Sequence, residues 1–399
     1  MPNSVFDFFS AGLLDLSLLQ ILAVLLTVTF ITVLTVTLYL HRSQAHRGVD
    51  FHPVLNHFFR FWSWLTTGMV TREWVAIHRK HHAFCETEND PHSPQTHGIA
   101  KVLFHGVDLY RQEAFKPETI EKYGVGTPDD WIERNLYRWE ALGPALLFGV
   151  DFALFGSIGI TFWALQMIWI PFFAAGVING LGHWWGYRNF DTPDTSTNLT
   201  PWGILLGGEE LHNNHHAFPS SAKFALAWFE FDIRWQLLRL LRVLRLASIR
   251  KVAPELACDR HIAIVDLETL RAIFAHRYGV MRHYFRAVIL PTLAEEAHHR
   301  GESVRRWKRK ARRVLGSEGA FLSTRKLALK VHILDHHPSV RRVCEYRERL
   351  RQIWARTSTD PEVLLKALRE WCQEAEQSGV QALRDFATEL RSYRLQPAA

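Results

Sequence analysis

The chain has 399 residues, a formal net charge of +7 and a hydrophobic content of 48%. Its four cysteines are scattered without a C-x-x-C pair, which excludes a disulfide framework and a zinc ribbon. Apolar residues concentrate in the first half and charged residues in the last third. We therefore expect a membrane-embedded domain over residues 1–252 and a soluble helical extension over residues 253–399.

The first long apolar segment covers residues 16–40 and carries no charge. As a helix it would extend roughly 37 Å, which exceeds the ~30 Å hydrocarbon core of a bilayer. It is longer than the apolar core of a signal peptide, and no Lys or Arg precedes it. We expect a membrane-spanning helix, with the short segment before it on the outer side.

Two further apolar stretches predict membrane-associated helices. Residues 53–70 are rich in aromatic residues but include Arg60, which is typical of an interfacial or re-entrant helix. Residues 141–182 contain one charge, Asp151, and a glycine-rich turn at 156–159, which predicts a hairpin of two spans. Lys and Arg flank every other connection, so the positive-inside rule places those connections in the cytosol. We expect a multi-pass protein of the bacterial inner membrane with its active site facing the cytosol.

The remaining sequence is strongly charged. Residues 233–252 alternate leucines with arginines, which predicts a basic amphipathic helix on a membrane surface or a core helix with a solvated edge. Residues 253–399 are typical of soluble helices of unknown role and contain no haem, flavin or dinucleotide motif. Residues 303–315 form a dense basic run, but no nucleic-acid-binding motif accompanies it, and we expect no nucleic-acid partner.

Histidines gather in three clusters, HRSQAH at 41–46, HRKHH at 78–82 and HNNHH at 212–216. An H-x-x-H-H sequence on a helix places its three imidazoles on one face. Histidine is the commonest metal ligand, and all three clusters lie on the predicted cytosolic side. The stretch NGLGH adds Asn179 and His183, four residues apart, where the last span should end.

The number of candidate ligands indicates two metal ions. One zinc ion takes about four ligands, and a nitrogen-rich pair of sites suits a first-row metal such as iron, although zinc, manganese and copper stay open. The candidates are His41, His46, His78, His81, His82, Asn179, His183, His212, His215 and His216. The pairs His298 with His299 and His336 with His337 lack a third ligand at helical spacing, and we expect no metal there.

The three clusters and their neighbours resemble the membrane fatty acyl desaturases of the Δ9 type. The resemblance runs from about residue 16 to residue 235 and includes the blocks REWVAIHRKHH, ENDPHSP, GHWWGYRNFD and GGEELHNNHHAFPSS. It implies an all-α integral membrane protein with about three spanning helices, further interfacial helices and a cytosolic helical cap that carries two ferrous ions. It also implies an oxygen-dependent oxidoreductase that uses two electrons to introduce a cis double bond into a saturated acyl chain. The resemblance implies no catalytic residues beyond the metal ligands.

By position, the resemblance divides the ligands between two irons. One iron would be held by His41, His46, His82 and His216, with Asn179 contributing through a water. The other would be held by His78, His81, His183, His212 and His215.

The resemblance also indicates where the substrate binds. Trp74 would line the acyl tunnel. The candidates for an acidic head group are Arg72, Arg188 and Lys223. An arginine and an aspartate that precede the second cluster in the animal acyl-CoA enzymes are replaced here by Ala76 and Ile77. Both acyl-CoA and phospholipid-linked substrates therefore stay open.

Partners and alternatives follow from the same residues. The chain lacks the H-P-G-G signature of a fused cytochrome b5, so electrons should come from a separate reductase through a ferredoxin-like or cytochrome b5-like carrier, with membrane lipids surrounding the spans. A related membrane di-iron hydroxylase of fatty acids or alkanes is the main alternative, although the first-cluster spacing and the HNNHHAFPS block favour the desaturase. A metal transporter would need ionisable ligands within the spans, where only Asp151 occurs.

Overall fold

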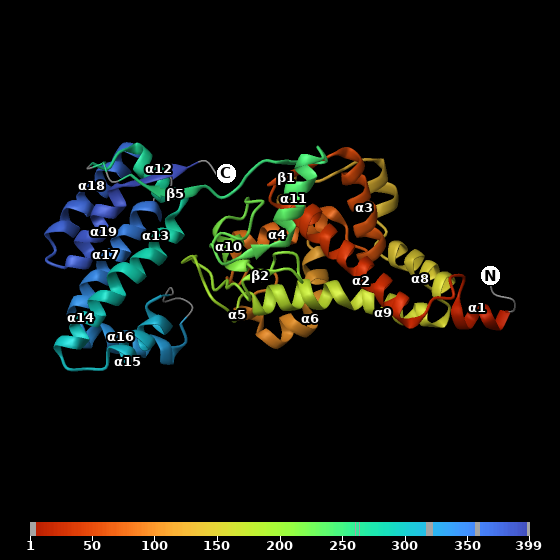
Figure 1. Ribbon diagram of the computed structural model, residues 1–399, viewed down its shortest axis with the longest axis horizontal. Coiled ribbons are helices and arrows are strands. Elements are labelled where there is room, and N and C mark those ends of the chain that lie inside the picture. The colour runs from red at the N-terminus through yellow and green to blue at the C-terminus, as the bar shows by residue number, and fades with distance from the viewer. Residues whose placement is uncertain (1–4, 260, 263, 317–321, 356–359, 397–399) are drawn as a thin grey trace. The chain divides into compact units, whose positions relative to one another are not determined.

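The structure is a computed structural model that describes residues 5–259, 261–262, 264–316, 322–355 and 360–396 (Figure 1). The chain forms two compact units. The first joins Met1–Arg188 to Ser196–Ala253, and the second joins Asn189–Thr195 to Pro254–Ala399. The break after Ala253 lies next to the expected domain boundary, but the short loop Asn189–Thr195 belongs to the second unit.

The first unit is built from helices, three of which have the wider π-helical winding and are labelled η. The helices are α1 (Val5–Ala11), α2 (Leu18–Thr35), η1 (Val36–Ala45), α3 (Pro53–Thr67), α4 (Thr71–Phe84), α5 (Pro94–His97), α6 (Ile99–Ala114), α7 (Pro117–Tyr123), η2 (Glu133–Tyr137), α8 (Leu142–Phe155), α9 (Ser157–Ile170), η3 (Pro171–Leu181), α10 (His212–Ala217) and α11 (Ile233–Val243). The short strands are β1 (Val49–Phe51), β2 (Trp202–Gly203), β3 (Phe231–Asp232) and β4 (Ala247–Ile249). β1 pairs antiparallel with β4, Val49 opposite Ile249, and β2 pairs parallel with β3. The predicted helical fold is confirmed.

Two helical rods are long and apolar enough to cross a membrane. Leu18–Ala45, which joins α2 to η1, has 28 residues, and Ser157–Leu181, which joins α9 to η3, has 25. At ~1.5 Å per residue both exceed the ~30 Å hydrocarbon core. On α2, Leu18 and Leu19 expose 73% and 77% of their surface, which is unfavourable in water. These apolar rods indicate association with a membrane.

The predicted hairpin over residues 141–182 is formed by α8 and α9, which lie side by side (Figure 1). Gly156 joins them with a φ of 64°, and a Cβ there would lie 2.7 Å from the Phe9 carbonyl oxygen of α1, so the turn requires glycine. α8 has only 14 residues, or roughly 21 Å. It is too short to cross a bilayer unaided, so by length the structure offers two spans where we expected three.

The basic stretch over residues 233–252 forms helix α11, which ends at Val243, and the strand β4. Arg234 is fully buried, with its guanidinium over the Phe30 ring at 4.6 Å, so one edge of the helix packs against α2. Leu240, Val243 and Leu244 expose 53%, 79% and 56% of their surface, which also fits an apolar face on a membrane surface. Both interpretations of this segment stay predictions.

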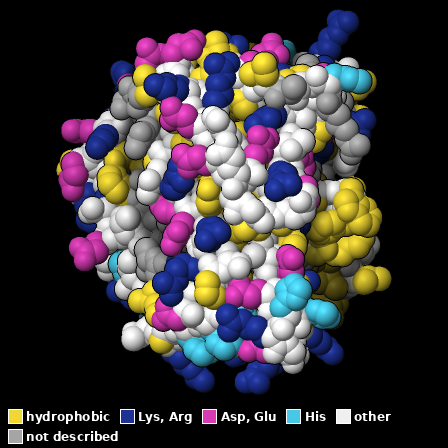
Figure 2. Space-filling view, turned by 90° about the vertical axis from the view of Figure 1, so that its left-hand side faces the viewer, with side chains coloured by type: hydrophobic (Ala, Val, Ile, Leu, Met, Phe, Trp, Pro, Cys, Tyr) yellow, Lys and Arg dark blue, Asp and Glu magenta, His cyan; other side chains and the backbone are white. Residues whose placement is uncertain are grey.

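The second unit is a helical domain with its own core. Its helices are α12 (Leu267–Ala275), α13 (Arg277–Tyr284), η4 (Phe285–Ile289), α14 (Leu290–His299), α15 (Val304–Val314), α16 (Thr324–His336), α17 (Pro338–Ala355), α18 (Pro361–Gln377) and α19 (Gln381–Arg391), and β5 (Glu255–Cys258) pairs antiparallel with β6 (Tyr393–Gln396). Apolar side chains from α12 to α19 form one continuous cluster. On the face in Figure 2, Lys and Arg are interspersed with Asp and Glu, and histidines reach the surface near its lower edge.

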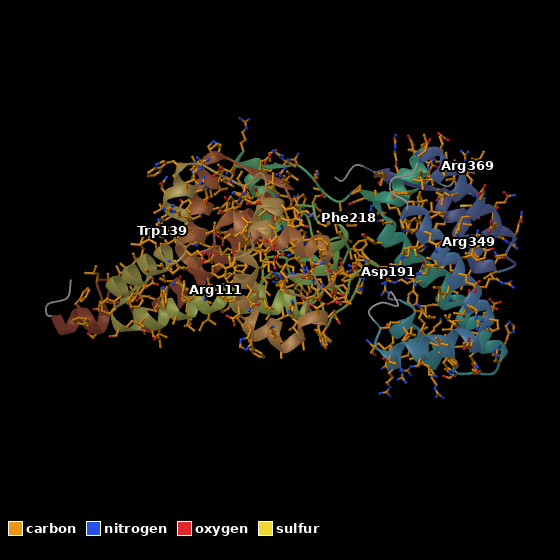
Figure 3. The ribbon with its side chains drawn as sticks, turned by 180° about the vertical axis from the view of Figure 1, so that it is seen from behind. Arg111, Trp139, Asp191, Phe218, Arg349 and Arg369 are labelled. Carbon is orange, nitrogen blue, oxygen red and sulfur yellow. The ribbon has the colours of Figure 1, made fainter. Side chains whose placement is uncertain are left out.

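A loop that lies between two histidine clusters in the sequence is part of this second unit. The N–H of Asp191, which is labelled in Figure 3, donates to the Tyr278 carbonyl oxygen at 3.0 Å. The Asp191 carboxylate pairs with Arg347 of α17. Both Asp191 and Arg347 are largely buried. The C-terminal helices therefore hold a segment of the chain that precedes the third histidine cluster.

Candidate metal centre

The first histidine cluster lies on η1, where the helix changes its winding. The His46 N–H donates to the His41 carbonyl oxygen at 3.1 Å, which is the i→i+5 bond of a π-helix. In an α-helix, residues five apart would point about 140° apart around the axis. The wider winding brings the His41 and His46 rings to the same side, with centroids 4.9 Å apart. This explains how an H-x4-H spacing can supply two ligands to one site.

The other two clusters lie on α4 and on the short helix α10. Every residue of α10 is buried. The Asn198 side-chain oxygen accepts from the N–H groups of Asn213 and Asn214 at 2.9 and 3.2 Å, and its amide donates to the Asn214 side chain at 2.9 Å. The two asparagines of HNNHH therefore anchor the helix and leave its three histidines facing α4.

Five imidazoles converge in a first group. Their ring nitrogens lie within 4.8 Å of one another, and the members are His41, His46, His78, His82 and His215. The Nε2 atoms of His46 and His78 are 2.7 Å apart, and those of His82 and His215 are 2.9 Å apart. Such convergence of the same ring nitrogen from three helices is what a shared metal ion requires.

A second group lies beside the first. Its members are His81, Cys85, His183 and His216, and the His212 Nε2 lies 2.9 Å from the His183 Nε2. The His82 and His216 rings stack at 4.5 Å, so the two groups are adjacent. The predicted histidines therefore come together. Asn179 lies at the end of η3 and lines the same cavity as His212.

The grouping differs from the division that the resemblance implies. In the structure His78 and His215 lie with His41 and His46, whereas His216 lies with His81 and His183. The assignment of individual ligands to two irons stays a prediction. Cys85 was not predicted, and its sulfur lies 3.9 Å from both His81 Nε2 and His183 Nδ1.

Three buried carboxylates orient these rings from behind. Glu209 lies 2.8 Å from His41 Nδ1, Asp90 lies 2.9 Å from His81 Nδ1, and Glu86 lies 2.9 Å from His183 Nδ1. A carboxylate at Nδ1 fixes the proton there and leaves the Nε2 lone pair for a metal. Sequence reasoning missed these three residues, although Glu86 follows the second cluster closely, Asp90 lies in ENDPHSP and Glu209 lies in GGEELHNNHH.

Burial favours the neutral form of four imidazoles on α4 and α10. Desolvation, reinforced by neighbouring histidines, lowers the pKa of His78 and His82 on α4 and of His212 and His215 on α10 well below the ordinary value. Neutral imidazole is the form that binds a metal. The nitrogen-rich donor set, the shared direction of the Nε2 atoms and the carboxylates behind them all fit a pair of first-row metal ions.

An apolar cavity of about 990 Å³ opens onto the histidines. His41, His78 and His212 form part of its wall, and most of the remaining wall comes from apolar side chains of α6, α8, α9 and η3. A volume of this size accommodates a long hydrocarbon chain. A chain inside it would lie against the imidazoles without leaving apolar surroundings.

The predicted substrate residues are placed in different ways. Trp74 lines the cavity and stacks on His78 with ring centroids 5.0 Å apart. Arg72 is exposed, and Arg188 and Lys223 are half-buried. None of these three cations lines the cavity, whereas Arg111 of α6, which was not predicted, does.

Comparison with known proteins agrees with this geometry. Residues 18–252 match the family described as "Fatty acid desaturase". The chain is 32% identical over 227 residues to Delta-9 acyl-lipid desaturase 1 of Arabidopsis thaliana, covering 56% of this chain and 72% of the relative. It is 31% identical to the sn-1 stearoyl-lipid 9-desaturase of Anabaena variabilis, covering 56% and 80%, and 31% identical to an acyl-CoA 5-desaturase of Anemone leveillei, covering 55% and 68%.

A second match covers a different part of the chain. Residues 270–396 match a family described as "Transposase". These residues include α12 to α19 and lie within the second unit. Sequence reasoning predicted helices for this region but found no resemblance for it.

Proposed function

Because the chain belongs to the fatty acid desaturase family of oxygen-dependent oxidoreductases, we propose that it introduces a cis double bond at the ninth position of a saturated, lipid-linked acyl chain. The reaction consumes dioxygen and two electrons at a di-iron centre held by the buried histidines. The position and the carrier follow the names of two relatives, a Delta-9 acyl-lipid desaturase and an sn-1 stearoyl-lipid 9-desaturase.

The observation that carries the proposal is the continuity between the apolar cavity and the histidines. The cavity wall includes His41 and His78 from the first group and His212 next to the second. A methylene pair lying in the cavity against Trp74, His41 and His212 would be held beside both groups. An unactivated C–H bond carries no charge for the protein to recognise, so the shape of the cavity has to position it.

The histidines supply the donors for two iron ions. The first group of five imidazoles and the second group with His212 give each ion a nitrogen-rich set, and Asn179 lines the adjoining cavity. Bound iron would activate dioxygen for the removal of two hydrogen atoms from the acyl chain. The residues of this chain orient the rings and keep water away from the reacting carbons.

The carboxylates and Trp74 do this positioning work. Glu209, Asp90 and Glu86 hold Nδ1–H protons and fix the ring planes. The indole of Trp74 lies parallel to the His78 ring, with an interplanar angle of 12°, and lines the cavity beside it. A smaller side chain would let water reach His78 and would loosen the acyl chain.

A lipid-linked substrate agrees with the surroundings of α4. Ala76 and Ile77, which replace the charged pair of the animal acyl-CoA enzymes, expose 0% and 2% of their surface. They are core residues, so no CoA phosphate can contact them. Arg111 in the cavity wall offers a cation for an acidic head group.

The orientation and the electron supply belong to the same proposal. The rods Leu18–Ala45 and Ser157–Leu181 would cross the membrane, and the basic connections would place the histidines on its cytosolic side. A separate reductase and a small carrier would deliver the electrons. Of the predicted head-group cations, Arg72, Arg188 and Lys223 stay candidates for contacts outside the cavity.

Lipid analysis of cells that express the chain tests the proposal. The wild type should produce acyl chains with a new double bond nine carbons from the carboxyl end, found first in phospholipids. His215→Ala should abolish the product, because it removes one ring from the first group. His57→Ala, in an exposed part of α3, is the matched control and should keep the product.

Three results would contradict the proposal in different ways. Hydroxylated chains without a new double bond would show the related hydroxylase reaction. A double bond at another position would refute the position, and a product that appears first in acyl-CoA would refute the carrier. Full activity of His215→Ala would remove the histidine centre from the mechanism.

A further inference from the structure

The second unit contains a separate set of metal-ligating side chains, far in sequence from the three histidine clusters. Glu302 is in the turn between α14 and α15, His336 ends α16, and His337 follows it directly. Their ligand atoms lie within 4.8 Å of one another. The His336 Nε2 is 2.7 Å from Glu302 Oε1, and the His337 Nε2 is 3.9 Å from Glu302 Oε2.

The chain bends so that two adjacent histidines face one carboxylate. Neighbouring residues on a continuous helix point about 100° apart. Here Pro338 follows His337, and a proline disfavours the helical conformation of the residue before it. His337 accordingly has φ −124° and ψ 87°, outside the helical region. The spacing of the two histidines could not predict this cluster, because the third ligand, Glu302, comes from the turn between α14 and α15.

An ion pair between His336 and Glu302 accounts for only part of the arrangement. His337 exposes 0% of its surface, yet neither of its ring nitrogens has a hydrogen-bond partner. The Glu302 Oε2, which faces His337 at 3.9 Å, has no hydrogen-bond partner either. Buried polar atoms without partners are costly and rare in folded proteins. A cation between the His337 Nε2 and the Glu302 Oε2 would satisfy both atoms at once.

The surroundings hold the ligands in place. Trp307 of α15 stacks on His336 with ring centroids 5.2 Å apart and meets His337 edge-on at 4.6 Å. The indole is 7% exposed, so it covers one side of the cluster. The nearby Arg300 is paired with Glu296 at 3.3 Å.

We propose that Glu302, His336 and His337 bind a zinc ion that ties the α14–α15 turn to the junction of α16 and α17. Two imidazoles and one carboxylate form a ligand set that suits zinc, with a water in the fourth position. Magnesium and calcium prefer oxygen ligands and would bind more weakly. The ion stabilises the second unit and has no part in the acyl reaction, so this site is independent of the proposed desaturation.

Zinc content of the purified full chain tests the site. After chelation, zinc reloading and gel filtration, Glu302→Gln and His336→Ala should each carry about one zinc less per chain than the wild type, because a three-ligand site rarely survives the loss of one ligand. The histidine groups of the first unit would also bind zinc. They are intact in every sample, so their zinc cancels when the zinc content of a variant is subtracted from that of the wild type. His332→Gln is the matched control, since His332 stacks near Trp307 at 5.8 Å, is exposed and lies outside the ligand set.

A second readout separates binding from a folding defect. Zinc should protect α14 to α17 of the wild type and of His332→Gln from protease, and it should not protect Glu302→Gln. Glu302→Gln keeps the size of a partly exposed side chain, so the fold should survive. Equal zinc content in the wild type, Glu302→Gln and His336→Ala would overturn the proposal, and so would an equal loss in His332→Gln. Failure of desaturation would leave both readouts unchanged.

Discussion

Replacing Asp90 with asparagine tests whether the carboxylates behind the histidines determine metal binding. The Asp90 carboxylate is fully buried and lies 2.9 Å from the His81 Nδ1. It also accepts the N–H groups of Glu86 and His92 at 2.7 and 3.1 Å. Burial alone would raise the pKa of Asp90, but its hydrogen-bonded contact with His81 and the backbone N–H of Glu86 hold it well below its usual range. The side chain is therefore an anion that only accepts hydrogen bonds.

Asparagine keeps the size of this side chain but replaces one accepting oxygen with a donating NH₂ group. Its amide group can donate to the His81 Nδ1, which would move the ring proton to the Nε2 and remove the lone pair that a metal needs. Loss of such an outer partner costs about 10- to 100-fold in metal affinity, or ~1.4–2.7 kcal/mol. We expect this loss for Asp90→Asn, measured by competition with a chelator on the purified full chain, and a matching fall in double-bond formation.

The chain contains a matched control for this substitution. Asp108 makes the same contact with His105 Nδ1 at 3.2 Å, but both side chains are more than half exposed and lie outside the histidine groups. Asp108→Asn should leave iron affinity unchanged. If Asp90→Asn and Asp108→Asn bound iron equally well, the carboxylate would not orient His81 for metal binding and the reasoning would be refuted.

Three further predictions concern the cavity, the pH response and the C-terminal unit. Val107 lies in the cavity wall, so Val107→Trp should fill part of the cavity and shift the products toward shorter acyl chains in lipid analysis. Val54→Trp, at an exposed position, should leave the chain-length profile unchanged. Equal profiles of the two variants would refute the cavity as the acyl site. Burial lowers the pKa of buried histidines such as His82 and His215, so the folded metal-free protein binds fewer protons than the unfolded chain. The free energy of unfolding should therefore be highest above pH ~6.5 and should decrease below that pH, by up to ~1.4 kcal/mol per pH unit for each such histidine. A thermal midpoint that does not decrease from pH 7.5 to pH 5.5 would contradict this. The full chain should bind no nucleic acid although Lys and Arg dominate Val304–Val314; a mobility shift of DNA with strong salt dependence would contradict this and would give meaning to the transposase match.

The histidine centre could be anticipated because its information is local. The spacing in HRKHH and HNNHH puts three rings on one helix face whatever the rest of the fold does. The spacing could not predict which rings of different clusters lie close together. His78 and His215 come together because α4 and α10 approach from different directions. The packing of these two helices cannot be inferred from the spacing within either cluster.

The winding of η1 and the supporting carboxylates show a second limit. H-x4-H favours no common face in an α-helix, and only the i→i+5 bond from His46 to His41 brings the rings together. Glu209 stands three residues before the third cluster, yet it supports His41 of the first. Sequence reasoning weighs neighbours in the chain and misses partners that a fold supplies.

Buried charges show a third limit. Arg234 resembles the other arginines of its segment in sequence, but the structure buries it over Phe30. Arg60, which argued for an interfacial helix, pairs with Asp130 at 2.7 Å and with Glu133 at 3.1 Å. A long-range ion pair neutralises a charge that local hydropathy counts in full.

Iron content of the purified chain tests the central claim most directly. Reconstitution with ferrous iron without oxygen should give about two irons per chain, because the ten predicted ligands exceed the needs of one ion. His82→Ala and His183→Ala, one from each group, should each lose iron, and the Zn²⁺ that we propose for the second unit is counted separately by element. A single iron in the wild type, or unchanged iron in both variants of correctly folded protein, would contradict the account.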